Sequence, residues 1–295
     1  MQNLSRRDFM KTGSAACVGA GLIGCSTSSE HLKEIGKTVH TKFAVNVEIW
    51  WKELDIIERI KNTAVLGFPA IEFWGYDGKD LEKVRETCDE LGLVITQFTA
   101  WGFTPGMNNP ENHDLVEEKI KDACQVAKRL NCRLATVVGG DDQPGMTQEE
   151  MHQHIITALK RVAPIAEDND LTLILEPMNI RVDHKGHCLY GSEPAVRICR
   201  EVNSSHVKIN WDLYHMHISE GDLCGHLREG FDQLGYVQLA DHPGRHEPGT
   251  GEIYYPRVLK EVYELGYRGY VGLECWPLND PITAAKRVAA ADQWT

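Results

Sequence analysis

Residues 171–176 read LTLILE and residues 207–212 read VKINWD, two short runs of mainly apolar and partly β-branched residues. Runs of this kind are typical of strands that lie buried in a parallel sheet. Together with these two, eight such runs occur, at residues 43–48, 70–74, 93–98, 133–138, 171–176, 207–212, 236–240 and 270–275. The sequence therefore predicts eight strands, spread from residue 43 to near the C-terminus.

Amphipathic helices are predicted between these strands. One apolar stripe has the helical spacing 4, 3, 4, 3 and consists of Val116, Ile120, Ala123, Ala127 and Leu130. Thr147 and Glu150 have the spacing of a capping box, which starts another helix. Eight consecutive strand–helix units predict parallel strands with right-handed crossovers, and eight such strands close into a single α/β domain, a (β/α)8 TIM barrel.

A doubly wound open sheet is the alternative α/β fold. Such a sheet usually has a glycine-rich dinucleotide-binding turn directly after its first strand. Residues 46–51 read NVEIWW and contain no glycine. The sequence therefore favours the barrel.

The N-terminus has the features of an export signal rather than of a folded domain. Arg6 and Arg7 precede a weakly apolar stretch, residues 12–24, which is shorter than the roughly 20 residues that span a bilayer. The stretch ends in Leu22-Ile23-Gly24-Cys25, which resembles a lipobox. We expect a twin-arginine signal peptide over residues 1–24, recognised by the twin-arginine export machinery.

On this interpretation the chain has three parts. The signal peptide is followed by a lipidated Cys25 and a polar tether over residues 25–42, and residues 43–295 form the catalytic barrel. The protein is then an exported lipoprotein on the periplasmic face, held at the membrane through its lipid anchor only. Seven further cysteines contain no CxxC pair, and we interpret most of them as small buried hydrophobic residues: Cys88, Cys124, Cys132, Cys188, Cys199, Cys224 and Cys275.

Composition narrows the classes of function. The chain has 295 residues, of which 42% are hydrophobic and 25% charged, as in a globular protein with a large core. Its formal net charge of −12 argues against a nucleic-acid partner, because affinity for phosphate backbones depends on clustered lysine and arginine. A small-molecule ligand is the better expectation.

Four predicted strands end in an oxygen-bearing side chain: Glu176, Asp212, Gln238 and Glu274. In a barrel, groups at the carboxyl ends of the strands converge at one mouth. Three carboxylates there would repel one another unless a cation lies between them. Oxygen ligands favour a hard divalent metal, so we expect Mn²⁺ or Mg²⁺, with Co²⁺ or Zn²⁺ as alternatives.

Other side chains near these strand ends could bind a substrate. His215 follows Asp212 by three residues, and Arg245 and His246 lie in the glycine-rich loop after Gln238. Their N–H groups can donate to hydroxyl or carboxylate oxygens. Four tryptophans that follow early strands could line the pocket, namely Trp50, Trp51, Trp74 and Trp101, and we include Trp101 among the substrate-binding residues.

The motifs around these positions resemble a known family. They are Glu176-Pro177-Met178-Asn179, Asp212-Leu213-Tyr214-His215, the loop from Gln238 to Glu252, and Gly272-Leu273-Glu274. Together they resemble the hydroxypyruvate isomerase group of the xylose isomerase-like TIM barrels. The resemblance runs from about residue 43 to residue 276, and the loop after residue 238 is its most specific part.

This resemblance implies a metal held by Glu176, Asp212, Gln238 and Glu274, with the two glutamates also acting as acid and base. The activity it implies is isomerisation of a small α-hydroxycarbonyl or sugar substrate through a metal-bound enediolate, in carbohydrate metabolism. Gln238 favours this branch over the ketose 3-epimerases, which carry histidine at the corresponding position. Endonuclease IV relatives require a histidine-rich three-zinc cluster, which this sequence lacks.

Three other outcomes stay open at this point. The same residues could catalyse ketose 3-epimerisation, or β-elimination from a 3-keto-glycoside, and the lyase reaction would suit an exported enzyme. A lipoprotein that only captures sugars is an alternative of another class. It would need the pocket but not two opposed acids, so the pair Glu176 and Glu274 favours an enzyme.

Overall fold

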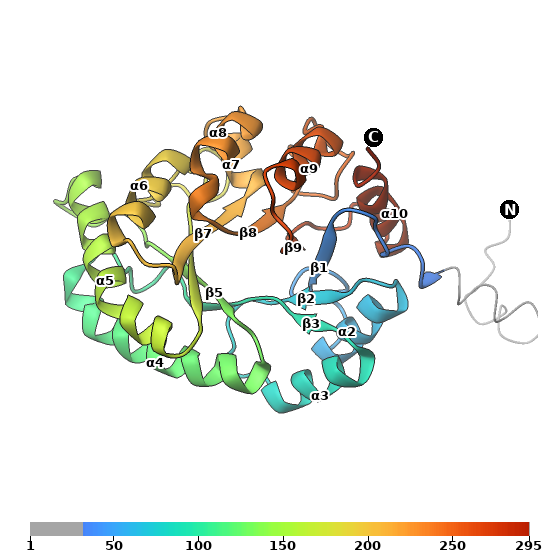
Figure 1. Cartoon of the computed structure of the whole chain (residues 1–295), viewed down its shortest axis with the longest axis horizontal. Helices are drawn as coiled ribbons and strands as arrows, with labels where there is room; N and C mark the ends of the chain where they lie inside the picture. Colours follow the sequence, from blue (N-terminus) through green and yellow to red (C-terminus); the bar gives the residue numbers. More distant parts are fainter. Residues whose placement is uncertain (1–31, 295) are drawn as a thin grey trace, which may run out of the picture.

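The computed structural model describes residues 32–294 and confirms a barrel of parallel strands surrounded by helices (Figure 1). Its strands are β1 (Lys42–Asn46), β2 (Ala70–Glu72), β3 (Val94–Ile95), β4 (Phe98–Trp101), β5 (Leu134–Val138), β6 (Thr172–Glu176), β7 (Val207–Asp212), β8 (Leu234–Leu239) and β9 (Tyr270–Leu273). They pair in the order β3-β2-β1-β9-β8-β7-β6-β5-β4. The expected strands are all present, with bounds that shift by a few residues.

Nine strands replace the expected eight because the third is divided. Its first part, β3, pairs with β2, and its second part, β4, pairs with β5. Thr96 and Gln97 lie between the parts, and their backbones still bond to the second strand, Thr96 N–H to Ile71 O at 2.9 Å and Phe73 N–H to Gln97 O at 3.4 Å. The interrupted strand therefore joins the two ends of the curled sheet.

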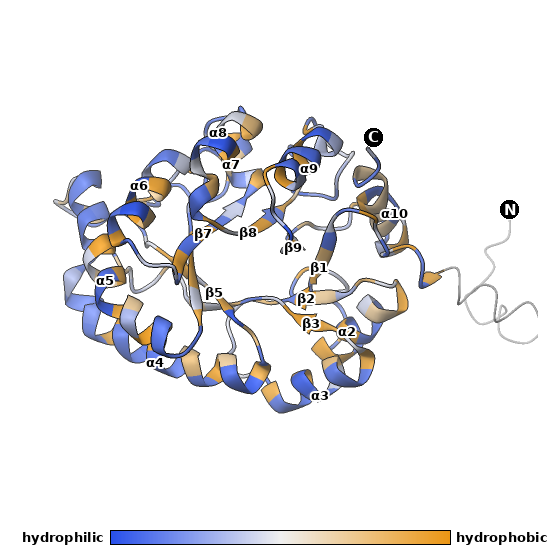
Figure 2. Cartoon of the chain, viewed as in Figure 1, coloured by the Kyte–Doolittle hydropathy of each residue, from blue (hydrophilic) through white to orange (hydrophobic). Residues whose placement is uncertain are grey.

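The helices form the outer ring and alternate with the strands (Figure 1). They are α2 (Ile56–Val65), α3 (Leu81–Leu91), α4 (His113–Leu130), α5 (Gln148–Asp168), α6 (Ser192–Val202), α7 (Leu213–Ser219), α8 (Leu223–Gly230), α9 (Tyr255–Glu264) and α10 (Pro281–Ala291), with short 3-10 turns η2 (Pro110–Asn112) and η3 (Phe231–Gln233). The predicted apolar stripe is the buried face of α4, and Thr147 and Glu150 form the predicted capping box at the start of α5. Figure 2 shows the outer helices as largely hydrophilic with hydrophobic stripes.

The segment before β1 is not a free tether along its whole length. Ile35 is 9% exposed, and Gly36 N–H donates to Leu66 O at 2.7 Å. The N–H groups of His40 and Thr41 donate to the carboxylate of Asp292, at 2.8 and 2.9 Å. Hydrogen bonds from the backbone to Leu66 and Asp292 therefore hold this part of the expected tether against the barrel. The expected signal peptide and Cys25 lie outside the described residues.

The cysteines agree with the sequence interpretation. All seven in the described part of the chain are free thiols, and all except Cys224 are buried. Between residues 32 and 294, no helix is long and apolar enough to cross a membrane.

Candidate active site

The strand register brings the predicted strand-end residues to one level of the barrel. Asp212 pairs with Gln238 across β7 and β8, and Glu176 ends β6, the neighbour of β7. Glu274 follows β9 directly, and β9 is paired with β8. All four side chains are buried, with relative exposures between 0% and 7%. The register therefore turns four distant sequence positions into one cluster.

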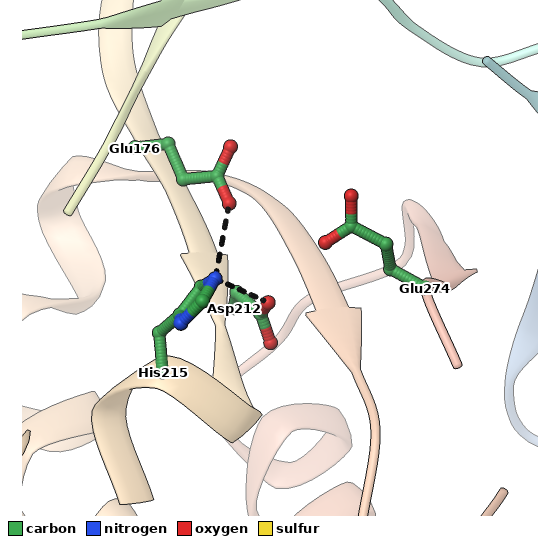
Figure 3. A group of neighbouring side chains, drawn as sticks. All are labelled: Glu176, Asp212, His215 and Glu274. Carbon is green, nitrogen blue, oxygen red and sulfur yellow. Dashed lines mark ion pairs between the residues drawn. The ribbon is translucent and has the colours of Figure 1, made fainter. Parts of the chain in front are cut away.

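Three of these side chains and His215 form a tight group (Figure 3). One ligand atom from each of Glu176, Asp212, His215 and Glu274 lies within 4.8 Å of the others. In Figure 3, Glu176 and Glu274 approach the group from different sides, while Asp212 and His215 lie at its base. Within residues 32–294 this is the sole group of acids, histidines or cysteines with such spacing.

The carboxylates of this cluster disfavour each other's ionisation. Burial, followed by the charges of Glu274 and Asp212, raises the pKa of Glu176 well above its usual value. Burial raises the pKa of Asp212 to about 7, against an opposing effect of Arg245. Burial also lowers the pKa of His215 well below its usual value, and nearby Arg245 acts in the same direction. A cation between the carboxylates would remove this penalty.

Asp212 provides a structural test of whether a metal fits. Its Oδ1 accepts the N–H of Tyr214 at 2.9 Å and so caps α7. Its Oδ2 is buried and accepts no hydrogen bond, and His215 Nε2 and Arg245 Nη2 lie 3.5 and 3.6 Å from it, beyond direct contact. An ionised oxygen in this situation is costly unless a cation contacts it. The donor set is mostly oxygen, so the cluster fits a hard divalent cation.

Arg245 supplies a positive charge next to the acids. Its guanidinium lies 2.8 Å from Glu274 Oε2 and 3.6 Å from Asp212 Oδ2. Burial by itself lowers the pKa of Arg245, but the charges of Glu274, Asp212 and Glu176 outweigh it and raise the pKa. Trp74 Nε1 donates to the other oxygen of Glu274, Oε1, at 2.7 Å. Glu274 is therefore oriented by a donor on each side.

A buried carboxylate organises the loop that carries Arg245. Asp241 accepts the backbone N–H groups of residues 242, 249, 250, 251 and 253, at distances between 2.9 and 3.1 Å. Arg245 itself has φ 57°, a left-handed conformation that non-glycine residues adopt at some energetic cost. Its neighbour Glu247 is fully buried and bonded to Leu278 N–H and Arg287. The loop is thus held in one shape that directs the guanidinium inward.

Gln238 is connected to a second buried acid. Its Nε2 donates to Glu72 Oε1 at 2.9 Å, and its Oε1 accepts from Asn210 Nδ2 at 2.6 Å. Burial, followed by the charge of Glu274, raises the pKa of Glu72 to about 7. Gln238 also lines the cavity beside the acid cluster, and its amide oxygen can accept a second contact in addition to that from Asn210. The spacing of residues in the sequence does not reveal the contact with Glu72, because 166 positions separate Glu72 from Gln238.

A cavity of about 360 Å³ opens above the cluster. It is lined by acids, donors and apolar groups: Trp74, Gln97, Thr99, Gly102, Phe103, Thr136, Val138, Glu176, Met178, His184, His215, Gln238, Arg245 and Glu274. Two larger hollows, of about 590 and 560 Å³, are lined mainly by residues of α9 with the C-terminal segment and of α6 with α8. Neither of these hollows contains the acid cluster. We therefore identify the cavity at the barrel mouth as the candidate active site from the residues that line it, not from its volume.

Some predicted substrate-binding residues lie outside this cavity. His246 Nδ1 bonds to Trp276 O at 2.8 Å, and Trp101 is a buried part of β4; neither lines the cavity. Of the four tryptophans, Trp74 does line it. Sequence reasoning missed His184 and Phe103, whose rings stack at 4.8 Å on loops that carry no strand-end signal.

The chain belongs to the xylose isomerase-like TIM barrel family, whose sequence profile matches residues 60–292. Among curated relatives, it is 28% identical over 243 residues to a hydroxypyruvate isomerase of Escherichia coli, covering 80% of this chain and 93% of the relative. A 2-oxo-tetronate isomerase of Pectobacterium atrosepticum is 27% identical over 250 residues, covering 80% of this chain and 92% of the relative. The predicted xylose isomerase-like TIM barrel family is therefore confirmed, and hydroxypyruvate isomerases are among the relatives of this chain.

Solved structures have the same fold. A family 2 AP endonuclease of Brucella melitensis superposes with a TM-score of 0.78 at 25% identity, covering 83% of this chain and 96% of that one. A 3-keto-D-glucoside 4-epimerase of Escherichia coli superposes with a TM-score of 0.71 at 22% identity, covering 85% of this chain and 98% of that one. These names differ widely in chemistry, so function has to be argued from the site.

Proposed function

We propose that this protein is a metal-dependent isomerase of a small α-hydroxycarbonyl or sugar-like substrate. The observation that carries the proposal is the buried Oδ2 of Asp212, which accepts no hydrogen bond, within a cluster of three carboxylates that borders a cavity. The curated relatives named as isomerases of hydroxypyruvate and of 2-oxo-tetronate support the reaction class.

Glu176, Asp212, Gln238 and Glu274 would hold the metal, with Mn²⁺ or Mg²⁺ as the preferred ions. When bound, the metal would polarise the substrate's carbonyl and neighbouring hydroxyl and make the proton on the intervening carbon more acidic.

Glu176 and Glu274 would act as the acid and base. One carboxylate would remove the proton from the hydroxyl-bearing carbon, which gives an enediolate, and the other, in its protonated form, would deliver a proton to the adjacent carbon. The hydroxyl proton would move to the former carbonyl oxygen, so that the carbonyl and the hydroxyl exchange places. Arg245 and His215 border the same cavity and would donate to the substrate's oxygens. The direct contact between Arg245 and Glu274 also fixes the orientation of that carboxylate.

Epimerisation of a ketose is the second candidate, and the size of the cavity favours it. A volume of about 360 Å³ is within the range of pockets that enclose whole organic ligands, which leaves room for a substrate larger than a three-carbon acid. The residues and the enediolate would be the same, and the proton would return to the opposite face of the same carbon.

We also propose that the mature protein is exported and anchored through lipid at Cys25. The proposal rests on the order of Arg6-Arg7, the short apolar stretch and Leu22-Ile23-Gly24-Cys25 in the sequence.

The test of the proposed reaction is substrate turnover by the purified protein, stripped of metal and then reloaded with Mn²⁺. The panel should contain hydroxypyruvate, ketoses and 3-keto-glycosides. Conversion should appear only after reloading, and Glu274→Gln should abolish it while ligand affinity stays within about tenfold. Binding without turnover by both proteins across the panel would instead favour a sugar-capturing lipoprotein.

A further inference from the structure

The ring of His215 lies between the side chain of Asn179 and the acid cluster. Its Nδ1 is 2.7 Å from Asn179 Nδ2. Its Nε2 faces the cluster, 3.5 Å from Asp212 Oδ2 and 4.0 Å from Glu176 Oε1 (Figure 3), and Arg245 Nη2 also lies 3.5 Å from it. A neutral imidazole carries one proton, and the partners of its two nitrogens decide which nitrogen holds it.

The orientation of the Asn179 amide is fixed by three other hydrogen bonds. Its Oδ1 accepts the backbone N–H groups of Val182 and Asp183, at 3.0 and 3.2 Å. Its Nδ2 donates to Asp183 Oδ2 at 2.8 Å. A flipped amide would place N–H groups against two N–H donors and its oxygen against a carboxylate. The nitrogen of Asn179 is therefore the atom that faces His215.

We infer that Asn179 is a positioning residue that holds His215 as the Nε2–H tautomer. Asn179 Nδ2 and Arg245 Nη2 are both donors only, but Asn179 lies 2.7 Å from Nδ1 whereas Arg245 lies 3.5 Å from Nε2. The shorter contact is the stronger hydrogen bond, so Nδ1 accepts it and the proton resides on Nε2, the nitrogen that also faces the carboxylates. A histidine that ligates a metal usually shows the opposite arrangement, in which its second nitrogen donates to an acceptor. Distance alone would group His215 with the three acids as a metal ligand. The position of its proton instead makes it a hydrogen-bond donor into the cavity.

The catalytic consequence rests on the proposed isomerase function, whereas the tautomer does not. Nε2–H would donate to the substrate oxygen on which negative charge develops during proton transfer. The ring would not need to rotate before the N–H donates, because Asn179 holds its Nδ1 side and is itself held by the backbone N–H groups of Val182 and Asp183. Asn179 does not line the cavity, so it would affect the reaction only through its contact with His215.

The tautomer can be measured without any substrate. Two-dimensional NMR of the full chain labelled with ¹⁵N-histidine distinguishes Nε2–H from Nδ1–H rings by the pattern of couplings to the ring carbons' protons. The His215→Gln variant identifies the His215 signals among those of the 13 histidines. We expect an Nε2–H ring, both in metal-free protein and after addition of Mg²⁺. An Nδ1–H ring, or loss of the Nε2 proton on Mg²⁺ binding, would overturn the inference.

Variants of Asn179 test whether this residue determines the tautomer of His215. Asn179→Asp presents a carboxylate to Nδ1, which should convert His215 to the Nδ1–H tautomer. Asn169→Asp, which makes the same change at an asparagine that contacts Ile165 O at the end of α5, should leave the His215 signals unchanged. If Asn179→Asp does not fold, Asn179→Ala should yield a mixture of both tautomers. A His215 ring that stays Nε2–H in every folded variant would show that Asn179 does not fix it.

Kinetics then separate this inference from the proposed function. Asn179→Asp should lower kcat by about 100-fold and change KM much less, since a lost proton-donating contact acts on the transition state. An altered tautomer with unchanged kcat would remove His215 from the reaction. A protein with no turnover on any substrate, yet with the Nε2–H ring, would refute the proposed isomerase and leave the tautomer assignment intact.

Discussion

Replacing Arg245 by lysine should reduce catalysis while leaving the fold and the metal site in place. The guanidinium is 17% exposed, contacts Glu274 Oε2 at 2.8 Å and lies 3.6 Å from Asp212 Oδ2. Lysine keeps the positive charge but has a single ammonium group, so it cannot contact Glu274 and present a second N–H to the substrate in the fixed geometry of the planar fork.

The magnitude follows from the contact that is lost. A hydrogen bond to a charged group contributes about 1.5 to 3 kcal/mol, and misorientation of Glu274 adds to this loss. We therefore expect kcat/KM to fall by roughly 10- to 1000-fold, which corresponds to about 1.4 to 4 kcal/mol of transition-state stabilisation. Steady-state kinetics with the first substrate identified provide the assay, together with metal content and Tm.

The control is Arg129→Lys, because Arg129 is half exposed and pairs with Glu82 at 3.5 Å on the outer surface. An exposed pair of this kind contributes about 0 to 1 kcal/mol to stability and nothing to turnover. An Arg245→Lys protein with the kcat/KM of the wild type would refute the role given to Arg245. A large loss of metal or Tm would show that the residue is structural.

Three further predictions concern metal, pH and the membrane. Asp212→Ala should lose most of the bound metal in elemental analysis, whereas Glu72→Gln, whose side chain faces Gln238 and Gly272, should retain most of it; near-full occupancy in Asp212→Ala would contradict the coordination. The folded pKa values of Asp212 and Glu72, both about 7, exceed the unfolded values of about 4, so their contribution to stability is complete below pH 4 and is lost as pH rises through 7. The Tm of metal-free protein should therefore fall between pH 5 and pH 8, and stabilisation by Mn²⁺ should grow over the same interval; a Tm that rises throughout would argue against these shifts. Cys25→Ala should release the protein from the membrane fraction, and a variant that stays membrane-bound would exclude the lipid as its anchor.

The barrel was predictable because its strands are buried on both sides. Runs such as residues 171–176 and 207–212 consist mainly of apolar residues, as strands buried on both sides require. The apolar stripe from Val116 to Leu130 shows which face of α4 packs inward. The break in the third strand was not predictable, since it depends on Thr96 Oγ1 bonding to Ile71 O and on Gln97 reaching Glu72, contacts between distant residues.

The site was predictable only where the strand pattern determines position. Glu176, Asp212, Gln238 and Glu274 are at strand ends, so the closure of the barrel brings them together. Loop residues are placed by contacts that sequence spacing does not encode. His246 follows Arg245 directly, yet a bond to Trp276 O directs its ring away from the cavity.

Deuterium incorporation tests the central claim, metal-dependent proton transfer between carbons, most directly. The protein with Mn²⁺ is incubated in D₂O with hydroxypyruvate, ketoses and 3-keto-glycosides, and NMR locates the label. We predict deuterium on the carbon next to the carbonyl with the carbon skeleton intact, and its loss in Glu274→Gln. Release of an aglycone would instead identify a lyase, and conversion without any deuterium at carbon would contradict proton transfer by the two glutamates.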